Sequence, residues 1–136
     1  MSSIFTRIVN GEIPCYKLAE NDKYIAFLDI NPIAKGHSLV LPKKETDYIL
    51  DIEDEDFQGL FLFAKMVGKA LGSCVPCERI GIAVIGLEVR HAHIHLIPIN
   101  SVYDIDFKKA KLKFTHEEFM EIASKVTSLL ASANSR

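Results

Sequence analysis

The chain has 136 residues, of which 49% are hydrophobic and 25% are charged, and its formal net charge is −2. This length and composition predict one soluble domain, residues 1–136, with a core that needs no disulfide. The small negative charge argues against a non-specific nucleic-acid binder, which carries a basic excess. No apolar run could span a membrane and no secretory signal is recognisable, so we expect no membrane partner.

The cysteines indicate the compartment. Cys15, Cys74 and Cys77 are an odd number, and such a set is typical of a reducing cytoplasm. Cys74 and Cys77 have the spacing of half a zinc site or of a redox pair. Because the chain has no second pair, we interpret this one as incidental, at the end of a helix.

The N-terminal third is predicted to form a short helix and three strands. Ile4–Val9 is an apolar segment of one or two helical turns, ended by Asn10 and Gly11. Asn21 and Asp22 form a turn dipeptide between two strand-like runs, which predicts a hairpin. The strands are expected at residues 16–20, 24–30 and 37–41.

Asp29 stands out in the second of these strands, because it lies between Leu28 and Ile30. A carboxylate in that place needs hydrogen-bond donors, since burying it unpaired is costly. It could bind a ligand, or it could only cap a turn.

The rest of the chain is predicted to contain two amphipathic helices around two strands. The acidic run 51–56 suits a helix N-terminus, and an apolar stripe follows it until Gly72 and Ser73, where we expect the helix to end. A strand is expected over 79–84, and residues 99–114 are expected to be irregular. Thr115 and Glu118 form a capping box for the last helix, and the tail 131–136 should be frayed.

Between these elements, His91, His93 and His95 occupy alternate positions. In an extended strand they share one face, with Ala92 and Ile94 on the other. Imidazole is a weak strand former, and three adjacent rings repel one another when protonated, so packing alone would favour Val or Thr here. The row is therefore interpreted as a functional site. It could supply two ligands to a zinc ion, or its central ring could act as a nucleophile beside rings that donate hydrogen bonds.

The segment His91–Ile97, H-A-H-I-H-L-I, resembles the signature of the histidine-triad (HIT) family, in which three histidines alternate with apolar residues. Three earlier blocks resemble the family in the same order: residues 4–14, 26–32 and 36–44. The similarity covers about residues 4–98.

The resemblance implies an α+β, HIT-like fold, with an antiparallel sheet of about five strands and two main helices on one face. The histidine row would lie on the other face, beside the N-terminal segment. It also implies a homodimer, no cofactor and no bound metal. Some members carry Cys-x-x-Cys near the N-terminus as part of a zinc site, but Ser3 and Thr6 stand here, so no zinc of that type is predicted.

The resemblance further implies a hydrolase or transferase of the phosphoramidase and dinucleotide hydrolase kind. His93 would attack the α-phosphorus of a purine nucleotide derivative, and water would resolve the nucleotidyl-histidine. His95 and His37 would be donors to the phosphate, and His91 would hold the row in register. The remaining site residues implied are those around the base, ribose and phosphate: Ile4, Phe5, Ile8, Phe27, Asp29, Ile30, Leu39, Gly86, Glu88 and Val89.

The sequence departs from the family in one loop. An asparagine usual in the preceding strand is absent, Leu87 replaces a glutamine, and Glu88 and Arg90 follow. Leu87 has no side-chain donor, and an ionised Glu88 would repel a phosphate. Two alternatives therefore stay open: a nucleotide-binding sensor with little turnover, and a zinc protein that uses the histidine row.

Overall fold

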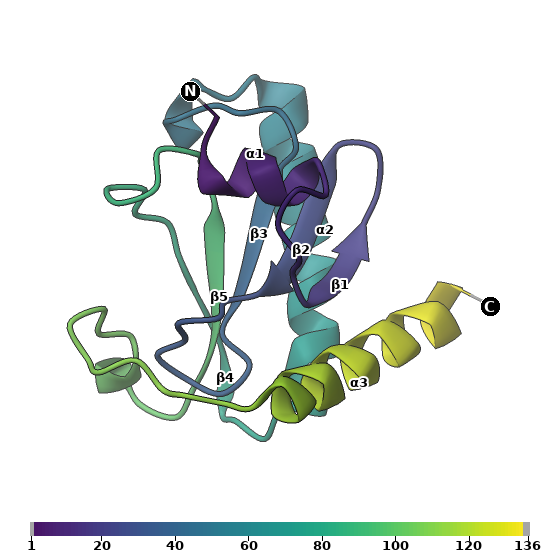
Figure 1. The fold of residues 1–136 in the computed structure, drawn as a ribbon, viewed down its shortest axis with the longest axis vertical. Helices are drawn as coiled ribbons and strands as arrows, with labels where there is room; N and C mark the ends of the chain where they lie inside the picture. Colours follow the sequence, from purple (N-terminus) through teal and green to yellow (C-terminus); the bar gives the residue numbers. More distant parts are fainter. Residues whose placement is uncertain (1, 135–136) are drawn as a thin grey trace.

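A computed structural model describes residues 2–134, which form three α-helices and five β-strands (Figure 1). The elements in chain order are α1 (Ile4–Val9), β1 (Lys17–Glu20), β2 (Tyr24–Leu28), β3 (Ser38–Pro42), α2 (Asp54–Cys74), β4 (Arg79–Ala83), β5 (Ile94–Ile99) and α3 (His116–Asn134). Two single 3₁₀ turns lie at Ile49–Asp51 and Val102–Asp104. None of the helices within residues 2–134 has the length and apolar character needed to cross a membrane.

The five strands form one antiparallel sheet in the order β1-β2-β3-β5-β4. This confirms the predicted α+β class and the strand count. β5, which carries the end of the histidine row, lies between β3 and β4 inside the sheet, so its backbone is paired on both sides. The end of the histidine row therefore lies on an inner strand of the sheet.

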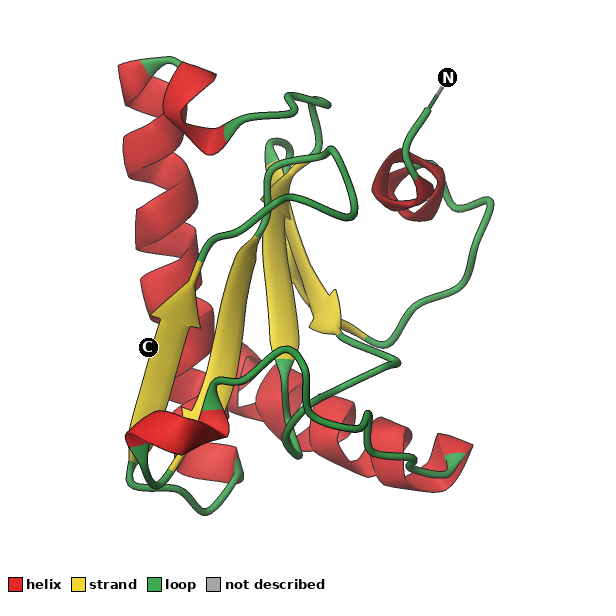
Figure 2. Cartoon of the chain, turned by 90° about the vertical axis from the view of Figure 1, so that its left-hand side faces the viewer, coloured by secondary structure: helices red, strands yellow, loops and turns green. Residues whose placement is uncertain are grey.

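The helices divide between the two faces of the sheet, as Figure 2 shows. α2 and α3 pack on one face over a core that contains Leu60, Val67 and Val126 from the helices and Ile94 and Leu96 from β5. α1 lies on the opposite side and contributes Phe5 to a second, smaller apolar cluster.

The alternation of side chains along the strands explains this division. Phe27 of β2 pairs with Leu39 of β3, and Leu39 pairs with His95 of β5. The three side chains form a row on the face away from α2 and α3, while Ile94 and Leu96 point to the helices. The predicted placement of the histidines beside the N-terminal segment is confirmed.

Several element ends differ from the prediction. β2 ends at Leu28 and β3 begins at Ser38, so Asp29 and His37, both expected inside strands, lie in the turn between them. α2 continues through Gly72 and Ser73 to Cys74, because the stop signal is Pro76: the residue before a proline avoids the helical region, and Val75 is extended, with φ −117° and ψ 120°. β5 begins at Ile94, so His91 and His93 lie just before the strand. α3 includes residues 131–134, which were expected to be frayed, and residues 135–136 lie outside the described residues.

The capping box of α3 forms as predicted. The Thr115 hydroxyl accepts from the Glu118 N–H at 3.1 Å, and the Glu118 carboxylate accepts from the Thr115 N–H at 2.8 Å. His116 lies exposed in this first turn and is hydrogen-bonded to the Tyr16 hydroxyl at 2.8 Å, away from the histidine row.

Candidate active site

A cavity of about 530 Å³ opens on the face of the sheet opposite α2 and α3. Three of the four histidines expected in the site line it: His37, His93 and His95. All ten residues expected around the substrate also line it, namely Ile4, Phe5, Ile8, Phe27, Asp29, Ile30, Leu39, Gly86, Glu88 and Val89. The structure thus brings together segments that are more than 80 residues apart in the chain.

His93 has one ring nitrogen fixed and one nitrogen open to the cavity. Its Nδ1–H donates to the backbone carbonyl of His91 at 2.7 Å, which leaves the lone pair on Nε2. The ring of Phe5 stands edge-on to it, with centroids 4.9 Å apart. Burial lowers the pKa of His93 below its usual value, so the neutral ring is the dominant form at pH 7. A neutral ring with one free nitrogen can act as a nucleophile.

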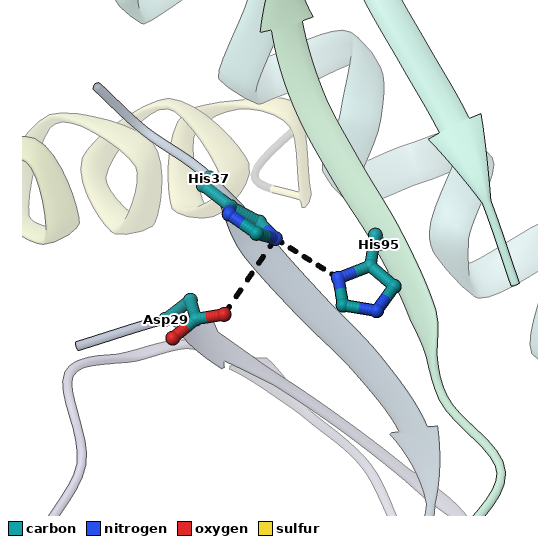
Figure 3. Close-up of side chains that lie close together, drawn as sticks. All are labelled: Asp29, His37 and His95. Atoms are coloured by element: carbon teal, nitrogen blue, oxygen red, sulfur yellow. Dashed lines mark hydrogen bonds and ion pairs between the residues drawn. The ribbon is translucent and has the colours of Figure 1, made fainter. Parts of the chain in front are cut away.

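His37 and His95 form a second arrangement, which we call the histidine relay (Figure 3). The Ile33 N–H donates to His37 Nδ1 at 3.2 Å, so the proton of neutral His37 is on Nε2. That Nε2 lies 2.9 Å from His95 Nδ1, which must accept. The proton of His95 is therefore on its own Nε2, the ring nitrogen left to serve as a donor in the cavity.

Burial keeps both relay histidines neutral. Desolvation, with the nearby Lys111 charge as a smaller cause, lowers the pKa of His37 to about 4. Desolvation and the charges of His93 and His37 lower the pKa of His95 to about 3. The hydrogen bonds also favour the neutral rings. An extra proton on His37 Nδ1 would point at the Ile33 N–H, and an extra proton on His95 Nδ1 would point at the N–H of His37.

Asp29 caps a turn, one of the two roles that its sequence position left open, and it also lines the cavity. Its Oδ1 accepts from the Asn31 N–H at 2.8 Å, so the side chain does cap a turn. Its Oδ2 lies 3.6 Å from His37 Nε2, too far for a hydrogen bond, and the residue lines the cavity. The second oxygen is thus available to accept from hydroxyl groups of a ligand.

A glycine places His37 at this point. Gly36 has a φ of +87°, a conformation that favours glycine, and a Cβ built on it would lie 2.9 Å from Val75 Cγ2. The turn before β3 can therefore pack against the end of α2 only with glycine at this position.

Asp29, His37 and His95 are also the residues that could hold a metal ion, because one ligand atom from each lies within 4.8 Å of the others. The proton arrangement does not fit this role. To bind a metal through Nε2, neutral His37 would carry its proton on Nδ1, directly opposite the Ile33 N–H. His37 and His95 therefore suit a hydrogen-bonded relay better than a metal centre shared with Asp29.

His91 does not line the cavity and is fully buried instead. Its Nε2–H donates to the Pro42 carbonyl at 2.7 Å, and its Nδ1 accepts from the Ser3 hydroxyl at 2.9 Å. The Glu45 carboxylate accepts from the Thr6 hydroxyl at 2.6 Å and from the Ser3 N–H at 2.7 Å. We call these four residues, Ser3, Thr6, Glu45 and His91, the N-terminal clasp, because they tie α1 to the segment before β5.

The clasp does not have the donors of a structural zinc site. Hydroxyl groups are poor zinc ligands compared with thiolates, and those of Ser3 and Thr6 are already engaged in hydrogen bonds. The donors around Glu45, first among them the Thr6 hydroxyl, lower the pKa of its carboxyl to about 2.

Most of the residues that depart from the family pattern lie in the loop before the histidines, and this loop borders the cavity. Gly86, with a φ of +73°, Leu87 and Glu88 all line it. Leu87 is 70% exposed, so an apolar side chain stands where a donor was expected. Arg90 does not line this cavity, and its guanidinium lies 3.9 Å from the Asp47 carboxylate at the surface.

Sequence reasoning missed several residues of the cavity lining, and three of them belong to one segment. Phe107, Lys108 and Lys111 come from the stretch 99–114, to which no role was assigned. The signal that could have found them is the density of lysines in residues 108–113, K-K-A-K-L-K. Other lining residues missed are Ile13, Pro14, Cys15, Leu28, Asn31 and Ile85.

Comparison with known proteins adds a family to this geometry. The sequence model of the HIT domain matches residues 10–102. The adenosine 5′-monophosphoramidase hnt1 of Schizosaccharomyces pombe is 34% identical over 134 residues, which cover 94% of this chain and 98% of that protein.

Two solved structures share the fold over almost the whole chain. A HIT-like protein from Bartonella henselae is 28% identical with a TM-score of 0.81, over 93% of this chain and 95% of that one. A zinc-bound histidine triad family protein from Mycobacterium smegmatis is 25% identical with a TM-score of 0.83, over 99% of this chain and 97% of that one.

Proposed function

Because this chain belongs to the HIT domain family, we propose that it hydrolyses derivatives of purine nucleoside monophosphates through a covalent intermediate on His93. The observation that carries the proposal is the hydrogen bond from His93 Nδ1 to the His91 carbonyl, at 2.7 Å. It fixes the tautomer, and it directs the Nε2 lone pair to a cavity of the size that a nucleotide needs.

In the proposed reaction, His93 Nε2 forms a bond to the α-phosphorus while the bond from phosphorus to the leaving group breaks and its electron pair goes to the leaving atom. A leaving phosphate departs as an anion, and a leaving amine takes up a proton from solvent. Water then attacks the phosphorus, the P–N bond breaks, and the nucleoside monophosphate leaves. His95 donates from Nε2 to the phosphoryl oxygens, and His37 holds that proton in place through the relay. Backbone N–H groups near Glu88 and Val89 would add further donors.

The nucleoside has a complementary place at the other side of the cavity. Phe5 and Phe27, with ring centroids 5.8 Å apart, and Leu39 are buried apolar residues that can contact a purine base. Ile4, Ile8 and Ile30 complete this apolar slot. Asp29 Oδ2 would accept hydrogen bonds from the ribose hydroxyls.

The test is incubation with adenosine 5′-phosphoramidate. The wild-type protein should release AMP, and mass spectrometry after brief mixing should find one adenylyl unit on His93. His93→Ala should bind AMP but show neither product nor adduct. An active His93→Ala variant would contradict the proposal.

One observation favours a second function, a nucleotide-binding regulatory protein with little turnover. Leu87 lines the cavity with an apolar side chain where the resemblance implies a donor near the phosphate, so fewer donors would stabilise the transition state. Tight AMP binding by the wild type, without turnover of any adenylyl derivative, would support this function.

Two coarser proposals concern the setting of the protein. We propose a homodimer through β4, because this strand lies at one end of the sheet and Ile82 on it is 56% exposed. Light scattering of wild type and Ile82→Lys would test it. We also propose a cytoplasmic location, which fits the three free cysteines.

A further inference from the structure

The segment between the last strand and the last helix closes one end of the cavity next to the relay. The Phe107 ring packs against His95, with centroids 4.8 Å apart, and against His37, with centroids 6.3 Å apart. The ammonium of Lys111 lies 5.9 Å from the Phe107 centroid, and Lys108 and Lys111 both line the cavity. In Figure 2 this segment crosses in front of the lower end of the sheet, while α1 lies at the upper right.

The segment is held in place by specific contacts. The Leu112 N–H donates to the Pro32 carbonyl at 2.8 Å, and the Lys108 N–H donates to Asp106 Oδ1 at 2.9 Å. Ile105 packs so closely over β4 that a Cβ on Gly81 would lie 2.5 Å from its Cδ1. The backbone therefore sets where the two lysines stand.

The charges along the cavity are unevenly distributed. Four of the lining side chains carry a charge: Asp29, Glu88, Lys108 and Lys111. Within residues 2–134, neither of these two ammonium groups lies within 4 Å of a carboxylate, and Lys111 Nζ donates only to the Phe107 carbonyl, at 3.4 Å. Two cations without carboxylate partners thus line the cavity, and Lys111 lies next to the Phe107 ring that packs on His95.

We propose that Lys108 and Lys111 form a subsite for an anionic leaving group, so that the preferred substrates carry a phosphate or polyphosphate on the α-phosphorus. The inference rests on the proposed function, which assigns the apolar slot to the base, Asp29 to the ribose and His93 to the attack. The leaving group is the part of such a substrate that these assignments leave without a partner.

Positive charge at Lys108 and Lys111 suits the proposed attack of His93 on a phosphate-bearing substrate. When His93 Nε2 bonds to phosphorus, the electron pair of the breaking P–O bond goes to the leaving oxygen, which departs as an anion and needs no proton. An amine must take up a proton to leave, so a nearby positive charge favours its departure less than that of an anion. In the second step water gives its OH to phosphorus, and its proton goes to solvent as His93 returns to the neutral form.

The experiment compares two substrates that share the adenylyl group. Diadenosine triphosphate has ADP as its leaving group, and adenosine 5′-phosphoramidate has ammonia. The values of kcat/KM are measured for the wild type, for Lys108→Gln with Lys111→Gln, and for Lys109→Gln with Lys113→Gln. The last variant is the matched control, because it removes the same charge from the same exposed segment at residues outside the cavity lining.

We expect the Lys108 and Lys111 variant to lose at least about ten times more kcat/KM on the triphosphate than on the phosphoramidate. The control should keep the wild-type ratio, and added salt should reduce the difference between the variants. Equal losses on both substrates, or a control that behaves like the test variant, would overturn the subsite.

A further measurement shows whether the two lysines bind the phosphate of the leaving group or a phosphate attached to the ribose. If the lysine variant weakens inhibition by adenosine 3′,5′-bisphosphate but not triphosphate hydrolysis, the cations serve the ribose side and the inference is wrong. If the wild type cleaves neither substrate, the proposed function itself fails, and the subsite fails with it. If the phosphoramidate is cleaved and the lysines do not affect the triphosphate, only the subsite fails.

Discussion

Two hydrogen-bonded groups flank the cavity, and they hold their histidines in opposite ways. In the histidine relay, a backbone N–H of Ile33 starts the chain, and every proton position up to His95 follows from it. In the N-terminal clasp, the Pro42 carbonyl orients His91 from one side, and the Ser3 hydroxyl, which can rotate, meets it from the other.

This difference decides how each group tolerates a proton. Burial is the main cause that lowers the pKa values of His37 and His95 to about 4 and 3, and nearby positive charges add to it. A proton added to the relay would also meet another N–H group. Burial lowers the pKa of His91 as well, but the hydrogen bond to the Pro42 carbonyl and the Glu45 carboxylate, 3.9 Å away, oppose this effect. A proton added to His91 also meets the Ser3 hydroxyl, which can turn to accept it. The relay is therefore rigid in its protonation, whereas the clasp can adapt.

The largest change in activity within this comparison should come from the relay. Two variants of His37 test it, and each keeps a different one of its two hydrogen bonds. His37→Asn keeps an acceptor for the Ile33 N–H but loses the donor to His95. His37→Gln places an amide N–H near the imidazole Nε2 and keeps that donor. We expect kcat/KM to fall about 100-fold in His37→Asn, the factor for one lost transition-state donor, and much less in His37→Gln.

Stability supplies the control for this pair. Each variant gives up one of two buried hydrogen bonds, so both should lose a comparable free energy of unfolding, about 1–3 kcal/mol. Urea unfolding measures it. If the two variants have the same activity, His37 only supports the fold and the relay has no role in turnover.

The relay also shows where sequence reasoning succeeded and where it could not reach. The alternation of His91, His93 and His95 and the position of His37 after Gly36 pointed to two strands beside the site, although β5 begins only at Ile94 and β3 only at Ser38. Three of these four rings line the cavity. The Ile33 N–H that sets the protons was not predictable, since it depends on how the turn before β3 folds. Phe107 and Lys111 were missed for a similar reason: a loop without periodicity does not reveal what it packs against.

The next effect, of intermediate size, is the response of the relay to acid. An unfolded histidine has a pKa near 6.5, so below that pH the unfolded chain binds protons that folded His37 and His95 do not. Stability is therefore complete above pH 6.5 and decreases as the pH falls toward 4, by about 1.4 kcal/mol per pH unit for each histidine.

Urea unfolding of the wild type and His37→Asn between pH 6.5 and 5 measures this effect. The variant lacks one of the two titrating rings, so its free energy should decline less steeply by about 1.4 kcal/mol per pH unit. Equal slopes would mean that His37 is protonated in the folded state and that the assigned tautomers are wrong. The clasp carboxyl, with a pKa of about 2, should stay ionised through this range.

The smallest change in activity should come from the clasp. There the Thr6 hydroxyl can be removed while His91 keeps its hydrogen bonds to Ser3 and Pro42. Thr6→Val keeps the shape of the side chain and loses the hydrogen bond to Glu45. Since α1 carries Phe5 and other residues of the apolar slot, we expect KM to rise about two- to tenfold, the factor for one hydrogen bond, with kcat nearly unchanged. Steady-state kinetics on the phosphoramidate would show whether KM and kcat separate in this way.

Two further variants show whether the geometry or the charge of the clasp matters. Thr6→Ser restores the hydroxyl and should return KM to near the wild-type value. Glu45→Gln keeps an acceptor for the Thr6 hydroxyl and the Ser3 N–H, and its lost charge is screened because the side chain is exposed. It should therefore raise KM less than Thr6→Val does. A larger rise in Glu45→Gln would mean that attraction between the carboxylate and His91, more than the hydroxyl contacts, holds α1 over the cavity.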